Sequence, residues 1–266
     1  MHQSAVEFTS GYREIPAVPR DRDYVACIWQ SFSGGHSRQS VILPDGCVDL
    51  IWQPGVDPFI AGPMTRPLAT SVPPGTECVG IRFQPGVAAV VLGVSAADLR
   101  DLQVPLVALF PAKRRHPSLD RVVAGTETPT LDRARDAISA LLPRAMPPDR
   151  FIMNASKWFA QHPDQLVTAF ITGSGVSERQ ARRRFLEHVG YGPKTLQRIL
   201  RMQRVLWSLS RPDACITLAQ LALASGYADQ AHLTREIVAL TGQRPSELAA
   251  GNPQSAVADL FKTRAP

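Results

Sequence analysis

SERQARRRFLEHVGYGPKTL, residues 177–196, is the stretch that decides the fold of the C-terminal half of this chain. Ser177 followed three positions later by Gln180 has the form of a capping box, in which the hydroxyl accepts the Gln180 backbone N–H and the amide reaches back. The pattern predicts a helix that begins at Ser177. Ala181 and Phe185, four positions apart, face a core, and a group of arginines occupies the rest of the helix surface.

The segment before this helix completes a helix-turn-helix unit. Asp164 to Ile171 is predicted to form a short helix, and Gly173-Ser174-Gly175 supplies the tight turn that joins the two helices. One such unit would be weak evidence, because short helix pairs are common and basic helix faces are usually only solvated.

The unit recurs 52 residues further along the chain without a gap. Thr217 and Gln220 repeat the capping-box spacing, Ser225-Gly226-Tyr227 repeats the turn, and Asp229 is placed to cap a helix that begins at Gln230. The matched positions are Leu166 and Leu218, Ala169 and Leu221, Phe185 and Ile237, Gly190 and Gly242, Pro193 and Pro245, Leu196 and Leu248, and Arg183 and Arg235. Agreement of caps, turns and apolar positions indicates two tandem helix-turn-helix units.

A long helical pattern joins the two units. It runs from Lys194 to Leu209 without interruption, with Leu196, Leu200 and Val205 on the inward side together with Leu209. Such a helix is about 24 Å long at 1.5 Å per residue. The pattern predicts a stiff connector with roughly the reach needed to hold two recognition helices one DNA turn apart, ~34 Å.

These features together resemble the DNA-binding domain of the AraC/XylS family of bacterial transcription regulators, over residues 159–249. The endings HVGYGPKTL and LTGQRPSEL are part of that resemblance. It implies that the exposed faces of both recognition helices read bases in adjacent major grooves. Carried over by position, the DNA-binding residues are Arg179, Arg182 and Arg183 in the first unit, and Gln230, Ala231, His232 and Arg235 in the second. The chain departs from the family at Leu233, Ile237 and Leu248, where aromatic residues are usual; the change concerns packing more than function.

The chemistry of these side chains suits a major groove. Arginine can donate two parallel hydrogen bonds to guanine O6 and N7, and glutamine can bond adenine N6 and N7. The arginines therefore suit guanine and Gln230 suits adenine. Because half or more of protein–DNA hydrogen bonds go to phosphate or sugar, Arg184, Lys194 and Arg198 are candidates for phosphate contacts. Arg184 is equally well explained as a surface residue, and His232 either donates to a base or is solvated.

The charge distribution agrees with a nucleic-acid-binding C-terminal half. Residues 151–266 contain 14 Lys and Arg against 8 Asp and Glu, and residues 1–150 contain 15 of each, so the net charge of +6 lies in the half with the repeat. PRAMPPD, residues 143–149, is the best linker in the sequence. The expected parts are a sensing or dimerisation domain at 1–145, a DNA-binding domain at 150–252 and a flexible tail at 253–266.

Residues 24–84 have the texture of a β-sheet. Short runs rich in Val, Ile, Phe and Trp alternate there with Gly, Pro and Asp clusters. These runs are residues 24–32, 40–44, 47–52, 58–62, 67–72 and 77–83. Residues 1–20 are expected to be extended, because Pro16 and Pro19 discourage helix. Helices are expected at residues 86–93, 95–99 and 131–142, the last being a core helix, with a dimer helix as the alternative.

The predicted fold class is therefore α+β. A β-rich N-terminal sheet or barrel-like domain with helices precedes an all-α C-terminal domain of two helix-turn-helix units joined by a linker helix.

The N-terminal segments LPDGCVDLIW, AGPMTRP and GIRFQPGVAAVVLG also resemble the module that precedes this DNA-binding domain in a subgroup of the same regulators. That resemblance implies a β-rich sensing or dimerisation unit. Trp29 and Trp52 are candidates for the wall of a small-molecule pocket, with Arg82 or Asp49 orienting a polar group. For any one of these side chains, a plain hydrophobic core is the favoured alternative. Asp45-Gly46 is expected to be a hairpin turn.

Other features point away from catalysis. The cysteines include no C-x-x-C pair, so we expect buried thiols rather than disulfides or a zinc site. They are Cys27, Cys47, Cys78 and Cys215. His36 has no second ligand at metal spacing, and Lys113-Arg114-Arg115 is expected to lie in a solvated loop. We expect no catalytic residue, metal or cofactor. Without a signal peptide or an apolar run of 18 residues, the chain is expected to be cytoplasmic and nucleoid-associated, with no membrane contact.

Three functions remain open. The first is a transcription regulator of double-stranded DNA, controlled by a small-molecule effector or by homodimerisation through the N-terminal domain, with RNA polymerase as a further candidate partner. The second is a cupin-like enzyme in the β half, which would need a His/Glu cluster that the sequence does not show. The third is a protein-interaction module built from the repeated helices. Salt separates the first from the third, because DNA binding weakens steeply as salt is added.

Overall fold

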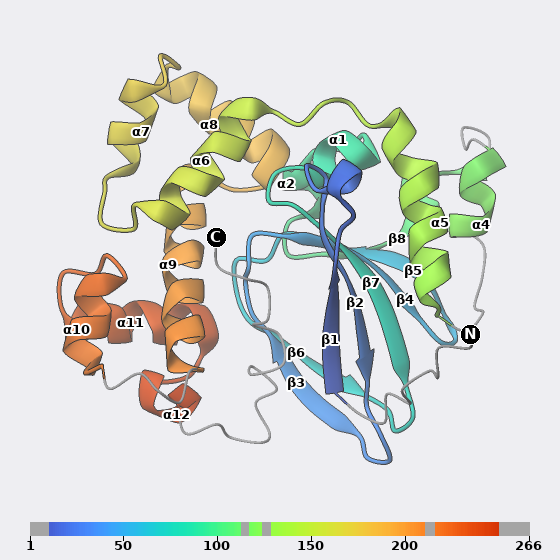
Figure 1. Ribbon diagram of the computed structural model, residues 1–266, viewed down its shortest axis with the longest axis horizontal. Coiled ribbons are helices and arrows are strands. Elements are labelled where there is room, and N and C mark those ends of the chain that lie inside the picture. Colours follow the sequence, from blue (N-terminus) through green and yellow to red (C-terminus); the bar gives the residue numbers. More distant parts are fainter. Residues whose placement is uncertain (1–10, 113–116, 124–128, 211–215, 250–266) are drawn as a thin grey trace.

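The computed structural model describes residues 11–112, 117–123, 129–210 and 216–249. A β-rich N-terminal half lies beside an all-helical C-terminal half (Figure 1), so the predicted α+β fold class is confirmed. Several predictions concern segments outside the described residues: Met1 to Ser10, Lys113-Arg114-Arg115, Cys215 and the tail at 253–266.

An antiparallel six-stranded sheet forms the centre of the N-terminal half, in the order β1-β2-β7-β4-β5-β8, and β3 pairs with β6 in a separate two-stranded sheet. The strands are β1 (Gly11–Pro16), β2 (Val25–Phe32), β3 (Arg38–Ile42), β4 (Val48–Gln53), β5 (Val56–Ala61), β6 (Leu68–Val72), β7 (Glu77–Phe83) and β8 (Gln103–Pro105). All six predicted runs are strands, and the segment expected to be extended supplies the edge strand β1.

The large sheet has two unlike faces, because successive side chains of a strand point to opposite sides. On β7, Val79, Ile81 and Phe83 lie in the main hydrophobic core, whereas Cys78 lies in a smaller cluster on the other face. Helix α5 (Leu131–Leu141) covers the first face (Figure 1) and buries Ala137 there, so the predicted helix at 131–142 is a core helix. The other helical segments of this half are α1 (Ala88–Leu92), α2 (Ala96–Leu99), α3 (Leu106–Leu109), α4 (Asp120–Val123), η1 (Pro19–Asp21), η3 (Pro117–Leu119) and η4 (Leu142–Arg144).

The turn at Asp45-Gly46 is not the hairpin that the sequence predicts. Gly46 has a φ of 84°, as a tight turn requires. The strands on its two sides belong to different sheets, however, since β3 pairs with β6 and β4 pairs with β5 and β7. The connection packs on the C-terminal half instead: a Cβ at Gly46 would lie 3.1 Å from Leu196 Cδ1 and 3.7 Å from Tyr191 Oη.

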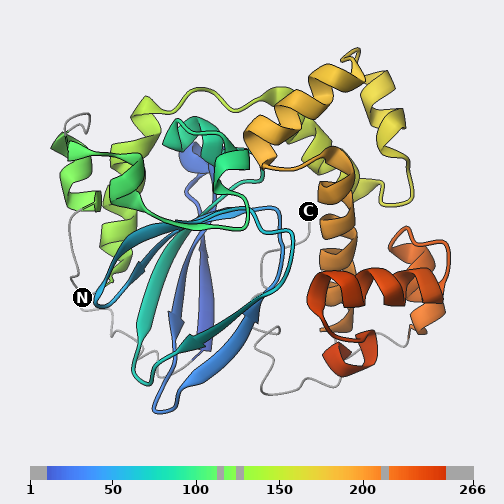
Figure 2. The same ribbon diagram turned by 180° about the vertical axis from the view of Figure 1, so that it is seen from behind.

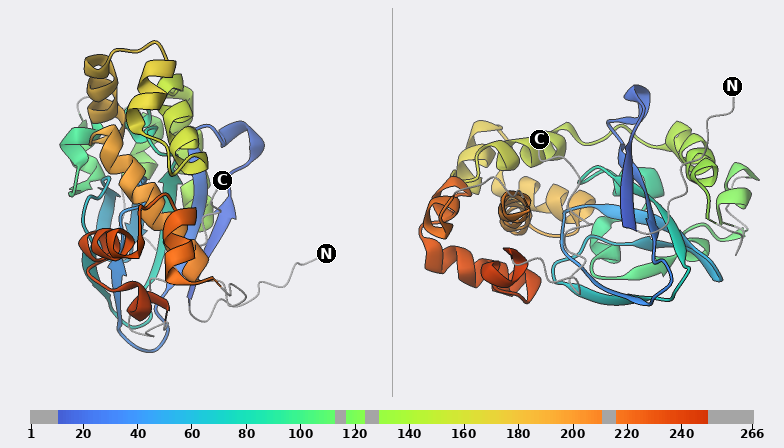
Figure 3. Two further views of the ribbon diagram at one scale, coloured as in Figure 1. Left: turned by 90° about the vertical axis from the view of Figure 1, so that its left-hand side faces the viewer. Right: turned by 60° about the horizontal axis from the view of Figure 1, so that its bottom comes forward.

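Seven helices form the described part of the C-terminal half. They are α6 (Arg150–Gln161), α7 (Val167–Gly173), α8 (Glu178–Val189), α9 (Pro193–Leu209), α10 (Leu218–Ala224), α11 (Gln230–Thr241) and α12 (Pro245–Ala249). Figure 2 shows α9 as an upright rod, with α7 and α8 near one end and α10 and α11 near the other, and the left view of Figure 3 shows the same arrangement from the side. Within the described ranges, none of the helices combines the length and apolarity that a bilayer crossing requires.

Candidate nucleic-acid interface

Helix α8 begins where its capping box predicts. Ser177 Oγ accepts the Gln180 backbone N–H at 3.3 Å, and the Ser177 N–H donates to Gln180 Oε1 at 3.1 Å. Ala181 and Phe185 are fully buried, so the opposite side of the helix faces solvent. The three arginines predicted to contact DNA from this helix are all exposed: Arg179, Arg182 and Arg183.

Helix α11 repeats this design with a different cap. Asp229 Oδ1 accepts the His232 backbone N–H at 2.6 Å. Leu233 and Ile237, which stand where the family usually has aromatic residues, are fully buried and fill the core. The His232 ring is half-buried and its Nδ1 accepts the Ala228 N–H at 3.3 Å, which leaves Nε2 as the donor. The other predicted contacts on this helix are exposed: Gln230, Ala231 and Arg235.

Helix α9 contributes buried side chains to the hydrophobic cores of both units. Leu196 and Ile199 pack in the core of the first unit, and Met202, Val205 and Leu206 pack in the core of the second. The helix has 17 residues, which span about 25 Å at 1.5 Å per residue. Because both units bury side chains of one continuous helix, α9 sets the separation and the relative angle of α8 and α11.

A buried arginine fastens the two units to each other. Arg201 is 8% exposed, and its Nε donates to the Pro163 carbonyl of the first unit at 2.6 Å. Its guanidinium also lies 5.9 Å from the ring centre of Tyr227 in the second unit. The turn of the second unit closes on the same carbonyl, since a Cβ at Gly226 would lie 2.2 Å from Pro163 O. Only glycine fits there, and the turn is therefore part of the joint.

Among the predicted phosphate contacts, Arg184 faces helix α6. Its Nη1 lies 3.6 Å from Asp149 Oδ1, and its guanidinium covers the Phe151 ring at 5.6 Å. Asp149 also caps α6 by accepting the Phe151 N–H at 2.8 Å. Arg184 thus helps to hold α8 against α6, and the structure does not group it with the other arginines of α8.

The other two predicted phosphate contacts lie near the start of α9. Lys194 is exposed and its Nζ donates to Gln197 Oε1 at 3.2 Å. Arg198 is 35% exposed at its side chain, and its Nε donates to Glu236 Oε2 on α11 at 2.6 Å. The Arg198–Glu236 pair links the connector to the second recognition helix directly.

A cleft of about 430 Å³, the interdomain cleft, lies where the N-terminal half meets these helices. Arg182 of α8 and Arg198 of α9 line it from the C-terminal half, and Leu240 brings α11 to its edge. Thr65 and Arg100 line it from the N-terminal half. Arg100 Nη1 also donates to the Gly190 carbonyl at the C-terminal end of α8, at 3.3 Å. Two predicted DNA contacts therefore share one cleft with an arginine that the sequence did not single out.

The β3–β4 connection forms a second contact between the halves. Leu43 is 5% exposed and belongs to the hydrophobic core of the second helix-turn-helix unit, with Val41 packed beside it. Next along the chain, the Pro44 carbonyl accepts a hydrogen bond from Gln203 Nε2 of α9 at 2.6 Å. The N-terminal half therefore completes the core of the unit that carries α11.

Three of the four predicted ligand residues meet on the face of the sheet away from α5. Arg82, 5% exposed, donates to Asp49 through Nε at 3.1 Å and Nη2 at 3.0 Å, and Trp29 Nε1 donates to the same carboxylate at 2.9 Å. Glu14 and Asp45 lie 3.3 and 3.4 Å from the guanidinium. Burial lowers the pKa of Arg82, but Asp49 and Asp45 hold that pKa above its ordinary value. An anionic effector would reach Arg82 only by displacing one of these carboxylates.

The fourth, Trp52, is not part of this group. It is 2% exposed in the core beneath α5, and its Nε1 has no hydrogen-bond partner among the described residues. Asp49 and Trp52 are three positions apart on β4, so strand alternation puts them on opposite faces. A single pocket on one face of the sheet therefore cannot be lined by both.

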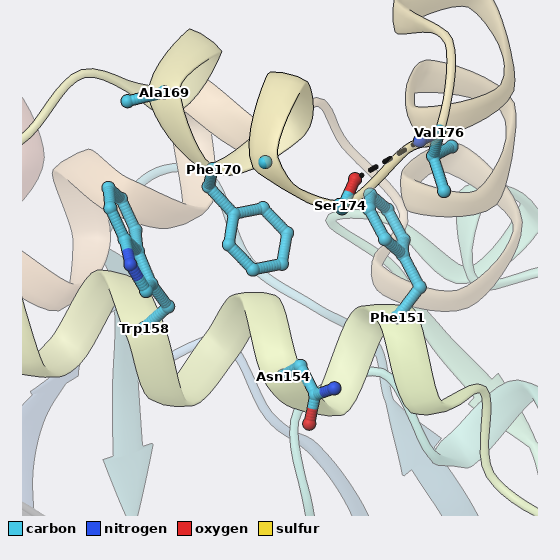
Figure 4. Close-up of a pocket in the computed structure, with 8 residues that line it drawn as sticks. Phe151, Asn154, Trp158, Ala169, Phe170, Ser174 and Val176 are labelled. Carbon is cyan, nitrogen blue, oxygen red and sulfur yellow. Dashed lines mark hydrogen bonds between the residues drawn. The ribbon is translucent and has the colours of Figure 1, made fainter.

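A second hollow, of about 480 Å³, lies between α6 and α7. Figure 4 shows the Phe170 ring between Trp158 and Phe151 of α6, with Ser174 bonded to the Val176 N–H. Ring centres in this group are 5.4 and 5.5 Å apart, as in a packed aromatic core. None of the lining residues is a predicted contact, and the hollow is a surface of the first unit's core.

Sequence reasoning missed the buried polar side chains of α9 that bond the segment before α7. Gln197 is fully buried and donates to the Gln165 carbonyl at 2.7 Å, much as Arg201 holds Pro163. Both side chains bond backbone carbonyls, which any residue supplies, so no spacing in the sequence reveals the partners. The one feature of this joint that the sequence does show is Gly226, in the predicted turn Ser225-Gly226-Tyr227.

Two protein families match this chain, one in each half. A family described as Helix-turn-helix domain matches residues 172–251, and a Domain of unknown function (DUF6597) matches residues 13–105. A search of curated sequences found no match.

Solved structures show looser likenesses. A probable AraC family transcriptional regulator from Rhodopseudomonas palustris CGA009 is 20% identical, with a TM-score of 0.35, over 38% of this chain and 96% of its own. ToxT from Vibrio cholerae is 11% identical, with a TM-score of 0.44, over 90% of this chain and 98% of its own. Unsaturated fatty acid bound ToxT is 9% identical, with a TM-score of 0.39, over 80% and 94%. At TM-scores below 0.5, these likenesses add nothing to what the helix-turn-helix match provides.

Proposed function

We propose that the chain is a DNA-binding transcription regulator of the AraC type that reads one asymmetric site across two adjacent major grooves. The match of residues 172–251 to a helix-turn-helix domain family supports this proposal. The observation that carries this proposal is the geometry of α8 and α11. Each is capped at its start, buried on one side and exposed on the side with the predicted contacts, and one rigid helix joins the two units.

The residues have distinct proposed roles. Arg179, Arg182 and Arg183 of α8 donate to guanine or to the backbone, and Gln230 of α11 bonds adenine. Arg235 occupies in α11 the position that Arg183 has in α8. Arg198 does not read bases in this scheme, because its bond to Glu236 directs it toward α11.

In vitro selection tests the proposal. Full-length protein is used to enrich duplexes from a randomised pool, and hydroxyl-radical footprinting is then done on the enriched duplex. We expect protection on two successive major grooves per chain, with a non-palindromic sequence in the protected region. Protection of one groove per chain would contradict the paired reading, and enrichment of no sequence would contradict sequence-specific binding altogether.

We further propose that control reaches the reading helices through the β3–β4 connection. Asp45 lies 3.4 Å from Arg82 inside the N-terminal half, and the neighbouring Gly46 lies against Tyr191 and Leu196 at the base of α9. An effector that displaced a carboxylate from Arg82, or homodimerisation that moved the sheet, would therefore act on α9. RNA polymerase and a second copy of the chain remain candidate partners within this proposal.

Asp45→Asn tests this route without changing the C-terminal half. It weakens the ion pair to Arg82, and we expect a change of at least about threefold in affinity for the enriched duplex, because ~0.7 kcal/mol of altered coupling has that effect. Asp57→Asn, an exposed aspartate on β5, serves as the control. Equal affinity and equal footprints for the wild type and both variants would refute the route.

A further inference from the structure

The interdomain cleft has the chemistry of an anion site. Three of its nine lining residues are arginines and none is acidic. Arg182 has no ion pair within the ranges that the structure describes, and Arg100 bonds only a carbonyl there. Arg198 is neutralised in part by Glu236. Thr65, which also lines the cleft, bonds the Asp101 carboxylate at 2.7 Å. Three arginines against the carboxylates of Glu236 and Asp101 leave a net positive charge contributed by both halves.

The start of α9 adds to this charge. Gly192 and Thr195 line the cleft, and Gly192 is the N-cap of the 17-residue helix without a side-chain cap. Pro193 has no N–H and the Thr195 N–H donates to the Gly192 carbonyl at 3.0 Å, so what this helix start offers an anion is the positive end of the helix dipole. Partial burial lowers the pKa of nearby Lys194, and the positive charges of Arg201 and Arg198 lower it further, while Glu236 acts in the opposite direction.

The place of the cleft suggests which anion fills it. It is bordered by α8, by the start of α9 and by α11. If α8 and α11 enter adjacent major grooves, the DNA backbone between those grooves must cross the surface between the two helices. Figure 2 shows that α2, which ends just before Arg100, and α8 lie next to each other on this side of the molecule.

We propose that the interdomain cleft takes a backbone phosphate of the bound duplex, and that Arg100 brings the N-terminal half into direct contact with DNA. The inference rests on the proposed reading of two grooves by α8 and α11. Arg100 supplies charge without base specificity, since a phosphate is the same in every sequence. The N-terminal half then affects DNA affinity by moving Arg100, in addition to any change that it causes in α9.

Arg100→Gln in the full-length chain is the first test. Glutamine retains a donor for the Gly190 carbonyl but loses the charge. We expect affinity at 0.15 M salt to fall about fivefold on the selected duplex and equally on an unrelated duplex. The negative slope of log K against log salt should become less steep by about 0.9, because one phosphate contact is lost. Arg100→Lys should restore the wild-type slope. The control is Arg121→Gln, which removes an exposed charge from α4, on the opposite side of the N-terminal half from the cleft (Figure 1).

Each failure has its own signature. A wild-type salt slope for Arg100→Gln, in a chain that still selects its duplex, would overturn the inference and leave the proposed function intact. A wild-type chain that selects no duplex would overturn both. Thermal melting without DNA, in sodium phosphate and in sodium chloride of equal ionic strength, provides the last arm. Stabilisation by phosphate that Arg100→Gln abolishes, together with an unchanged DNA slope, would assign the cleft to a free anion and overturn the DNA source.

Discussion

Leu43→Ala is the sharpest test of the contact between the two halves. Leu43 belongs to the N-terminal half by sequence, but its side chain, 5% exposed, is part of the core around α9, α10 and α11. The substitution removes about three methyl or methylene groups, worth ~2.4 kcal/mol at ~0.8 kcal/mol each. The cavity left behind adds to this, and buried Leu→Ala changes cost roughly 2–5 kcal/mol in total. We expect a loss of about 3 kcal/mol in the stability of the second unit.

The assay must locate the loss as well as measure it. Urea unfolding gives the free energy of unfolding, and hydrogen exchange read by mass spectrometry shows which peptides lose protection. The control is Leu102→Ala, the same chemical change at a leucine that is 52% exposed in the same half. We expect α10 and α11 to lose protection in Leu43→Ala and not in Leu102→Ala. If the two variants protect α11 equally, Leu43 is not part of that core, and the N-terminal half does not control the second unit through it.

Three further predictions follow from the same contacts. Arg183→Ala should lower affinity for the selected duplex by ~1–3 kcal/mol and relax preference at one base pair; an equal loss on random duplexes, measured by competition, would make it a phosphate contact instead. Arg201→Met leaves the Pro163 carbonyl without its donor, so urea unfolding should show a loss of ~1–3 kcal/mol in the free energy of unfolding. The selected duplex should bind more weakly with an unchanged salt slope. Wild-type stability would show that the bond to Pro163 contributes little. Burial raises the pKa of the Cys78 thiol to about 11, so only about one thiol in a thousand is ionised at pH 8. Iodoacetamide should therefore label Cys78 far more slowly in native than in urea-unfolded protein, which peptide mapping measures. Rapid labelling of the native protein would mean that the sheet opens.

Sequence patterns predicted the parts of this fold that depend on neighbours in the chain. Capping boxes located the starts of α8 and α10, and strand texture located all six predicted strands, because hydrogen bonds of caps and alternation of side chains are local. The hairpin expected at Asp45-Gly46 was wrong because local turn chemistry does not determine which strands pair. Local alternation should also have separated Asp49 from Trp52, since an odd spacing on one strand reverses the face.

What sequence reasoning could not reach depends on contacts between distant segments. An apolar residue at position 43 is expected in any buried strand end, and nothing in its neighbours indicates that its partners lie on α9 more than 150 residues away. Arg100 is similar: it follows a short helix like any surface arginine, and only the packing of α2 against α8 brings it into the cleft that Arg182 also lines. Both residues join the two halves, and both lie outside the repeated helix-turn-helix pattern from which the DNA-binding domain was predicted.

The duplication itself has a consequence for the DNA site. The two units share caps, turns and core positions, but α8 exposes three arginines where α11 exposes Gln230, Ala231 and a single arginine. Arg201 and the close approach of the Gly226 turn to Pro163 join the two units. Under the proposed reading of two grooves, the two unlike faces would therefore contact DNA together and in one order. A duplex with its two half-elements exchanged would present the guanine-containing half to α11 instead of α8. The chain should therefore discriminate against a duplex with its two half-elements exchanged as strongly as against one lacking a half, and equal affinity for exchanged and native order would show that the connector is not rigid.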